Sequence, residues 1–422
     1  MRIYAIMLLL LFSLLHTLSS HHLPFEHAEV FGGLDLGYYY VDLQVGSLET
    51  KQTVIVDTGS TVTAFPCAGC HNCGSHMDAY FDYRRSNTSR VVGCAEDAGC
   101  SSCSEGKCHY YQGYTEGSSI AGFYVEDYVR LGDDPTADKV KFIFGCHDSE
   151  TNLFRTQLAD GIMGLAFGHR RGQTIIDALF QSHDVSTDIL ALCFGATGGF
   201  MTVGGYNTSM HLSPLQTVPL YGSAYYGVKL QALAVDDHTI QLHPNEAGAA
   251  RGADTIIDSG TTFVYLNTAV HDKLWSAFMG YCNQAGKCGD GQVVVAGEYH
   301  PCYRYDTGSI EDFFGSFPTI HLTFDREVVA WSPASYLFSW SDHSNHFCLG
   351  VYSNGGGGNV LGAVFMRGHD VIFNRANQTV SFATSLCDPA QLITPNRRRL
   401  QAAPQSRTEK WWGIAALAQW LW

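Results

Sequence analysis

Two short segments of the sequence each place an aspartate before a hydroxyl residue, a glycine and a second hydroxyl residue. They are Asp57-Thr58-Gly59-Ser60 and Asp258-Ser259-Gly260-Thr261. The glycine lets the backbone turn sharply and brings amide N–H groups close to the preceding carboxylate. Hydrogen bonds to a carboxylate favour its charged form, whereas a second carboxylate nearby disfavours two negative charges together. If the two segments meet, the sequence predicts an aspartate pair that shares one proton and serves as general base and general acid.

The elements that must position these aspartates are repeated as well. Patterns typical of buried strands, residues 54–56 and 255–257, lead into the two aspartates. A second motif, Gly161-Ile162-Met163-Gly164-Leu165, is echoed by Asn359-Val360-Leu361-Gly362-Ala363. From each aspartate to the second glycine of this motif the separation is 107 residues in the first half and 104 in the second. Two matching motifs at matching spacing predict two similar halves that face each other across a pseudo-twofold axis.

These motif pairs resemble the pepsin family of aspartic proteases over roughly residues 36–390. The resemblance implies an all-β, bilobal pepsin-like fold with pseudo-twofold lobes and a flap hairpin, which covers an extended peptide in the cleft between the lobes. It also implies that Asp57 and Asp258 are the catalytic pair. Such a pair activates a water molecule to hydrolyse a peptide bond, without a metal or an organic cofactor.

The resemblance assigns supporting roles to the other residues of the two segments. Ser60 and Thr261 match the hydroxyl residues that bond the aspartates, and Thr58 and Ser259 match the residues that lock the two loops together. Gly59 and Gly260 complete the two active-site loops. Each hydroxyl residue supplies a side-chain donor, which fits the chemistry predicted for the pair.

A hairpin is predicted over residues 109–124, where apolar and polar residues alternate on both sides of a Glu-Gly turn. The turn lies in the run Tyr114-Thr115-Glu116-Gly117-Ser118. In the pepsin family a flap tyrosine covers the scissile region, and the resemblance assigns this role to Tyr114. The alternative is a strand aromatic that packs on the core, because aromatic residues are common in strands.

A second resemblance narrows the family. Residues 65–77 and 114–124 resemble the plasmepsin V-like processing proteases. These enzymes reside in the endomembrane system and cut secretory cargo after Arg-x-Leu sequences. An arginine in the substrate requires an acidic subsite, and we expect Asp78 and Glu116 to supply it. The alternative for both residues is an ordinary solvated surface acid.

The chain contains 14 cysteines, and half of them lie in a cysteine-rich insert over residues 67–108. They are Cys67, Cys70, Cys73, Cys94, Cys100, Cys103 and Cys108. One interpretation of the Cys-x2-Cys-x2-Cys run is a zinc site. A secreted protein and the odd local count favour disulfides, with one insert cysteine paired outside, for which Cys146 is the expected partner. Resemblance to the β-secretase arrangement implies the bridges Cys193–Cys387, Cys282–Cys288 and Cys302–Cys348.

The expected domain order follows from the ends of the chain and from the repeat. Arg2 precedes an apolar run, residues 6–15, and small residues follow it. This pattern predicts a cleaved signal peptide over residues 1–20, with an uncleaved signal anchor as the alternative. The remaining expected segments are an N-terminal lobe at 21–212, a C-terminal lobe at 213–390, and a basic linker with a Trp-rich apolar tail at 391–422.

The sequence predicts a location in the secretory pathway, in the lumen of the endoplasmic reticulum or the Golgi, with secretion or a vacuolar location as alternatives. Three N-glycosylation acceptor sequences, at Asn87, Asn207 and Asn377, fit this prediction. The apolar end of the tail, residues 411–422, is too short to span a bilayer as a helix. Three interpretations stay open: membrane association through an interfacial anchor, a truncated span, or an unstructured end.

The composition excludes some classes of partner. Charged residues make up 15% of the chain, and 40 acidic against 25 basic residues give a formal charge of −15, which argues against nucleic acid. We expect a monomer that acts on protein or peptide substrates from the secretory cargo. Two alternatives are a secreted, vacuolar or β-secretase-like protease with hydrophobic specificity, and a catalytically silent binding protein on the same fold. Silent relatives tend to lose an aspartate or its hydroxyl neighbour, and this chain keeps both.

Overall fold

The computed structural model describes residues 25–96, 99–167, 174–222, 224–243, 255–289, 292–293, 302–306, 308–339 and 345–389. The expected signal peptide and the tail at 391–422 lie outside these ranges. Strands dominate the described part of the chain, as the resemblance to pepsin-like proteases predicts. Within that part, no helix combines the length and the apolar character that crossing a membrane requires.

The N-terminal half is built mainly from strands. In β8, buried side chains alternate with more exposed ones along much of the strand, the period-2 pattern of a sheet with one face on the core. The elements are β1 (Glu26–Gly33), β2 (Tyr38–Val45), β3 (Thr50–Asp57), β4 (Thr63–Pro66), β5 (Arg90–Val91), β6 (Ser102–Ser104), β7 (Lys107–Gly113), β8 (Ser119–Leu131), β9 (Val140–Glu150), α2 (Leu153–Thr156), β10 (Gly161–Gly164), α3 (Ile175–Gln181), β11 (Ile189–Gly195), β12 (Gly198–Val203) and the 3-10 turn η1 (Thr208–Met210).

The C-terminal half combines shorter strands with several helices. The longest, α4, begins where the Asn267 side chain accepts a hydrogen bond from the N–H of Ala269 at 3.0 Å. The elements are β13 (Gln216–Pro219), β14 (Gly227–Val228), β15 (Leu230–Val235), β16 (His238–Gln241), β17 (Thr255–Ile257), β18 (Val264–Leu266), α4 (Thr268–Cys282), β19 (Gln292–Val293), β20 (Cys302–Arg304), α5 (Ile310–Gly315), β21 (Ile320–Phe324), β22 (Glu327–Trp331), α6 (Pro333–Tyr336), β23 (Leu337–Phe338), β24 (His346–Leu349), β25 (Val351–Ser353), β26 (Asn359–Leu361), α7 (Ala363–Met366), β27 (His369–Asn374) and β28 (Thr379–Thr384).

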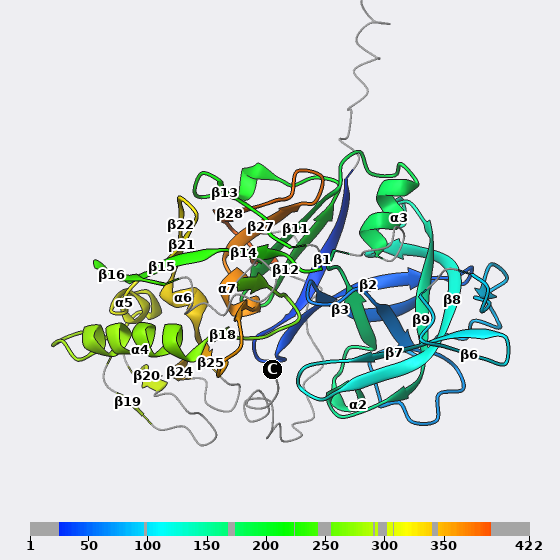
Figure 1. The fold of residues 1–422 in the computed structure, drawn as a ribbon, viewed down its shortest axis with the longest axis horizontal. Helices are drawn as coiled ribbons and strands as arrows, with labels where there is room; N and C mark the ends of the chain where they lie inside the picture. The colour runs from blue at the N-terminus through cyan, green and yellow to red at the C-terminus, as the bar shows by residue number, and fades with distance from the viewer. Residues whose placement is uncertain are drawn as a thin grey trace, which may run out of the picture.

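One 15-stranded sheet runs through both halves of the described molecule. Its order is β13-β28-β27-β11-β12-β1-β2-β3-β10-β4-β9-β8-β7-β6, and β5 pairs with β8. β11 of the N-terminal half pairs antiparallel with β27 of the C-terminal half, where Leu190 lies opposite Phe373. In Figure 1 these strands lie between the blue-to-cyan elements of one half and the yellow elements of the other. A shared sheet therefore joins the two expected lobes, whose exact boundary stays a prediction.

Strand β3, which ends at the first aspartate, is buried along most of its length. Val54 and Val56 are completely buried, and Ile55 is 7% exposed. β3 pairs with β2 on one side and with β10 on the other. Burying a valine or isoleucine side chain stabilises a fold by roughly 1.5–3 kcal/mol. Burial of this apolar run therefore fixes the position of the strand that ends at Asp57.

All 14 cysteines are in disulfides. Three pairs lie within the insert, and its seventh cysteine, Cys67, pairs with Cys146 of β9. The sulfurs of the Cys-x2-Cys-x2-Cys run are thus used in disulfides, and among the described residues no group of three or more His, Cys, Asp or Glu side chains is arranged to hold a metal ion. The seven pairs are Cys67–Cys146, Cys70–Cys73, Cys94–Cys103, Cys100–Cys108, Cys193–Cys387, Cys282–Cys288 and Cys302–Cys348.

The three asparagines of the acceptor sequences, Asn87, Asn207 and Asn377, are all exposed. A glycan needs such exposure because it is bulky and solvated. Glycosylation of these asparagines stays a prediction.

Candidate active site

Each aspartate of the repeated motif lies at the end of a parallel strand pair. β3 pairs with β10, which places Gly164 opposite Asp57. β17 pairs with β26 in the same way, which places Leu361 opposite the residue before Asp258. The N–H of Leu165 donates to Asp57 O at 2.7 Å, and the N–H of Asp258 donates to Leu361 O at 3.0 Å. The matched spacing in the sequence therefore corresponds to one local arrangement that the chain uses twice.

Four hydrogen bonds lock the two aspartate loops to each other. The N–H of Thr58 donates to Ser259 Oγ at 3.0 Å, and the N–H of Ser259 donates to Thr58 Oγ1 at 2.9 Å. Each hydroxyl then donates to a strand carbonyl of the other half, Thr58 to Ile257 O at 3.0 Å and Ser259 to Val56 O at 2.7 Å. Thr58 and Ser259 are buried. A hydroxyl suits this position because it accepts one hydrogen bond and donates another.

The two motif glycines bring each loop against the opposite carboxylate. A Cβ on Gly59 would overlap the carboxylate of Asp258, and a Cβ on Gly260 would overlap that of Asp57. The N–H of Gly59 donates to Asp57 Oδ1 at 2.8 Å, and the N–H of Gly260 donates to Asp258 Oδ1 at 2.9 Å. The two aspartates therefore face each other, and each accepts a backbone hydrogen bond from its own loop.

The outer hydroxyl residues of the motifs bond the remaining carboxylate oxygens. Ser60 Oγ donates to Asp57 Oδ2, and Thr261 Oγ1 donates to Asp258 Oδ2 at 2.7 Å. Burial and then the charge of Asp258 raise the pKa of Asp57 well above its usual value, and the hydrogen bonds from Ser60 and the backbone oppose this rise without cancelling it. A pair of this kind holds one proton while the other carboxylate is charged. It can take a proton from water and give one to a carbonyl oxygen.

The predicted flap is a hairpin of β7 and β8. Its turn closes through the N–H of Tyr114, which donates to Ser118 O at 2.9 Å, and Gly117 at the tip has a φ of +90°. Residues that carry a side chain rarely adopt a φ in this range, so a glycine suits the turn. Burial and then the charge of Asp57 raise the pKa of Tyr114 well above its usual value. The hairpin thus brings the Tyr114 hydroxyl to the first aspartate loop.

The two expected subsite acids lie in different places. Glu116 is half-buried in the flap turn, two residues after Tyr114, and its charge contributes to the raised pKa of that tyrosine. Asp78 pairs instead with Lys51, whose Nζ is 3.7 Å from Asp78 Oδ1. Lys51 precedes Asp57 on β3 by six residues, which is about 20 Å of extended strand. The structure therefore places Glu116 at the flap and Asp78 beside the first half of β3, away from Asp57.

The surroundings of Asp78 are acidic. Its N–H donates to Asp160 Oδ1 at 2.9 Å. Lys51 also lies 3.6 Å from Asp42 Oδ2. Burial and then the charge of Asp160 raise the pKa of Asp78 to about 6. Asp78 is thus part of a local cluster of acids around one lysine of the same chain.

Phe154 of α2, which no sequence motif reveals, packs behind Tyr114, and the two rings form an apolar wall at the flap. Phe154 is 4% exposed, and its ring centroid lies 4.9 Å from that of Tyr114. Asn152, just before α2, donates from Nδ2 to Gly117 O at 2.8 Å and so ties the helix to the flap turn. A four-residue helix offers too few positions for a periodic pattern, so the sequence carried no usable signal for this wall.

Comparisons with known proteins agree with this geometry. A family profile described as eukaryotic aspartyl protease matches residues 38–385. Aspartic protease 5 of Toxoplasma gondii is 32% identical over 85% of this chain and 37% of its own length. Plasmepsin V of Plasmodium falciparum (isolate 3D7) is 35% identical over 88% of this chain and 75% of its own length. Aspartic proteinase 36 of Arabidopsis thaliana is 28% identical over 88% of this chain and 81% of its own length. The chain thus spans little more than a third of the Toxoplasma relative.

Proposed function

The chain belongs to the eukaryotic aspartyl protease family, and on this basis we propose that it is an aspartic endopeptidase in which Asp57 and Asp258 form the catalytic pair. In this proposal a water molecule lies between the two carboxylates. One carboxylate takes a proton from the water while the pair gives a proton to the carbonyl oxygen of the scissile peptide bond. The shared proton belongs to the pair as a unit and not to one member.

The observation that carries this proposal is the reciprocal arrangement of the two loops. Gly59 lies against the carboxylate of Asp258, and Gly260 lies against that of Asp57. This contact brings the two carboxylates close together, and burial and then the charge of Asp258 raise the pKa of Asp57. A silent binding protein on the same fold would need neither this contact nor a shared proton.

The flap supplies the second half of the proposed mechanism. Tyr114 and the turn around it would cover an extended peptide and exclude water from the reacting bond. Tyr114, backed by the ring of Phe154, would contact an apolar side chain of that peptide. Holding the peptide against the aspartate pair supplies part of the rate increase, because the entropic cost of bringing the reacting groups together is met when the peptide binds.

We further propose that the enzyme processes secretory proteins after Arg-x-Leu-like sequences. The similarity to plasmepsin V supports this specificity, and so does the position of Glu116 in the flap turn. A carboxylate there would bind an arginine guanidinium through paired, charge-assisted hydrogen bonds. Asp78 would join this subsite only by giving up its ion pair with Lys51. Glu116 is therefore the acid on which the proposal depends.

A secretory location is part of the same proposal. All 14 cysteines are in disulfides, and such bonds form and persist in oxidising compartments. The exposed acceptor asparagines support passage through the lumen of the endoplasmic reticulum or the Golgi. Secretion from the cell and a vacuolar location share the same chemistry and remain the alternatives.

The activity is tested by digesting a diverse peptide library with the wild-type protein and with Asp57→Asn, from acidic to neutral pH, and sequencing the products by mass spectrometry. We expect peptide-bond cleavage by the wild type and a loss of about 10²–10⁴-fold or more in the variant. The enzyme proposal would be wrong if the wild type cleaved no peptide at any pH, or if Asp57→Asn cleaved as well as the wild type. The silent binding protein would then be the better interpretation.

The specificity is tested with a peptide that contains Arg-x-Leu and a matched peptide in which lysine or glutamine replaces the arginine. Glu116→Gln should reduce kcat/KM for the arginine peptide by about tenfold, the effect of losing one charge-assisted contact. Asp78→Asn is the matched control and should change it little. Cleavage between bulky apolar residues with no preference for arginine would favour the general secreted, vacuolar or β-secretase-like protease instead.

A further inference from the structure

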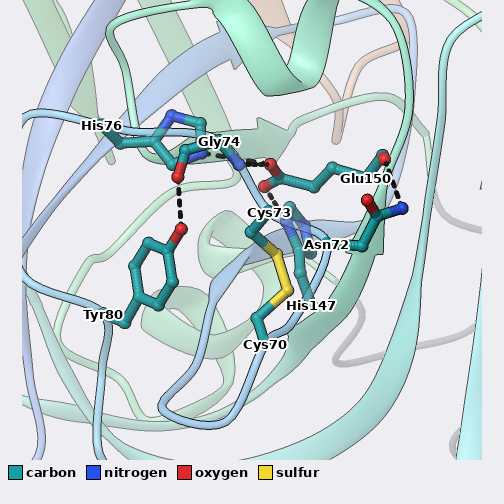
Figure 2. Close-up of a disulfide and its surroundings, with 8 residues drawn as sticks. All are labelled: Cys70, Asn72, Cys73, Gly74, His76, Tyr80, His147 and Glu150. Carbon is teal, nitrogen blue, oxygen red and sulfur yellow. Dashed lines mark hydrogen bonds and ion pairs between the residues drawn. A yellow bond between two sulfur atoms is a disulfide. The ribbon is translucent and has the colours of Figure 1, made fainter.

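Two histidines and a glutamate with completely buried side chains lie beside the Cys70–Cys73 disulfide (Figure 2). Glu150, the last residue of β9, lies between them. Its Oε1 is 2.8 Å from Nδ1 of His147, and its Oε2 is 3.1 Å from Nε2 of His76. Burying ionisable groups destabilises a protein unless each is paired. The proposed hydrolysis uses none of the three, so another role must account for their burial.

The hydrogen bonds assign the protons of this cluster. Nδ1 of His76 is 3.1 Å from Gln157 O, so both ring nitrogens of His76 face oxygens that only accept. Burial lowers the pKa of His76, but the hydrogen bond and charge of Glu150, with the carbonyl of Gln157, together raise it above its usual value. Burial lowers the pKa of His147 by more than Glu150 raises it. The geometry therefore places a proton on each ring nitrogen of His76, and burial makes His147 the weaker base of the two histidines.

The same carboxylate holds the loop that the Cys70–Cys73 disulfide closes. The N–H of Gly74 donates to Glu150 Oε2 at 2.9 Å, and the N–H of Glu150 donates to Asn72 O at 3.4 Å. A Cβ on Gly74 would overlap the backbone carbonyl of Arg155 in α2. The disulfide loop, oriented by Glu150 as Figure 2 shows, therefore packs directly on the backbone of α2.

α2 connects this cluster to the flap. At its C-terminal end, His76 bonds the carbonyl of Gln157, the C-cap residue. At its other end, the N–H of Leu153 donates to Ser118 Oγ of the flap at 3.3 Å. Between these two ends of α2, the ring centroid of Phe154 lies 6.4 Å from that of His147, and the two ring planes make an angle of 89°. A four-residue helix is not stable by itself, so contacts with its neighbours must set its position.

We propose that Glu150, together with His76 and His147, positions α2 beneath the flap and thereby sets the apolar wall that Phe154 and the Tyr114 ring packed on it form for the substrate. This inference rests on the proposed function, because the wall acts only on a peptide bound under the flap. Glu150 is a positioning residue that works through His76, the disulfide loop and α2. Through the apolar wall, Glu150 affects which size of apolar side chain the enzyme accepts at one position of the peptide, next to Tyr114.

The charge of the cluster makes this positioning sensitive to pH. Below the pKa of His147 a second imidazolium forms beside the single carboxylate of Glu150, and its repulsion from charged His76 opposes the packing of α2. The balance of charge in the cluster depends on its three members and on the titratable groups that face them. These are Asp148 in β9, Asp160 after α2, Tyr110 in β7 and Tyr80, whose hydroxyl donates to Gly74 O.

The test compares wild type, Glu150→Gln and a matched control on two peptides that differ by leucine or alanine at one position near the scissile bond, scanned position by position. The control is His211→Gln, which breaks a similarly buried histidine–carboxylate pair, His211 with Asp370 at 2.8 Å, in another part of the molecule. We expect Glu150→Gln to reduce the leucine-over-alanine ratio of kcat/KM about tenfold at one position, mainly through KM. The control should change that ratio at no position.

A second variant separates positioning from a general loss of folding. His76→Gln keeps a donor toward Glu150 but removes the charge, so we expect a smaller reduction of the same ratio and a shifted acidic limb of the pH–rate profile. Thermal unfolding of each variant shows whether it is folded at the assay temperature. If wild type cleaves, Asp57→Asn does not, and both cluster variants keep the wild-type ratio and pH profile, the positioning proposal is wrong and the proposed function stands. If wild type does not cleave, both fall together.

Discussion

The two aspartate loops have the same hydrogen bonds but different surroundings. Asp57 is 4% exposed and Ser60 is 9% exposed, whereas Asp258 is half-buried and Gly260 is exposed. The flap covers the first loop, and the charge of Asp57 reaches Tyr114. Nearly identical local sequences thus produce the same turn, while the elements packed around each turn decide its burial and hence its electrostatics.

This difference has a chemical consequence. Burial contributes most to the raised pKa of Asp57, and the charge of Asp258 comes second. The two carboxylates thus have matching hydrogen bonds but unequal burial, and the proton that they share is held by the pair as a unit.

Replacing either aspartate should stop cleavage. Asp57→Asn and Asp258→Asn each leave a pair that cannot both accept and donate the required protons. We expect each to reduce kcat by about 10²–10⁴-fold or more, measured on one good peptide substrate. If Asp258→Asn kept more than a tenth of the activity, the pair would not act as a unit.

Adding a methyl group to either loop glycine should separate the two carboxylates. Gly59→Ala and Gly260→Ala each place a Cβ where the opposite carboxylate lies. We expect activity to fall by about 100-fold, the scale of a displacement of about 1 Å in a catalytic site. Gly280→Ala in α4 is the control, because a Cβ there meets no atom within 4 Å. Unchanged activity in Gly59→Ala would show that the loops do not meet as described.

Removing a locking hydroxyl should cost stability in either loop. Thr58→Val and Ser259→Ala each leave a buried N–H of the other loop without its acceptor. An unsatisfied buried donor costs about 1–3 kcal/mol, which urea unfolding can measure. Thr58→Ser keeps the hydroxyl and is the control, expected to lose less. Equal losses in Thr58→Ser and Thr58→Val would assign the effect to packing.

The pH dependence of stability should differ between wild type and Asp57→Asn. The pKa of Asp57 is raised in the folded protein, against about 3.9 in an unfolded chain. Above that pH the unfolded chain releases a proton that the folded protein keeps, so this group makes folding less favourable as pH rises toward the folded-state pKa. Asn does not titrate, so the free energy of unfolding of Asp57→Asn should gain on wild type from about pH 4 toward pH 7. Parallel curves over this range would contradict the raised pKa.

Some features could be read from neighbouring residues alone. The turn after Asp57 needs the glycine at position 59, and the strand before Asp57 needs an apolar run. The motif and its copy at Asp258 therefore predict both the turn and the strand. The flap turn is similarly local, because Gly117 provides its positive φ. The matched spacing of the motifs then predicts that two such units exist. Local backbone geometry depends on adjacent residues, and for this reason the sequence is informative about it.

Other features depend on residues brought together from distant parts of the chain. Asp78 shares the acidic character of Glu116, yet it pairs with Lys51 at the far end of β3. Glu150 joins His76, 74 residues earlier, to a loop and a helix that no motif connects. Such partnerships arise when strands and loops pack, because burial and electrostatic pairing are set by the neighbours in space. The chain's own order of residues specifies the aspartate pair, and the packing of the lobes settles which acids face the substrate and which are held in the interior.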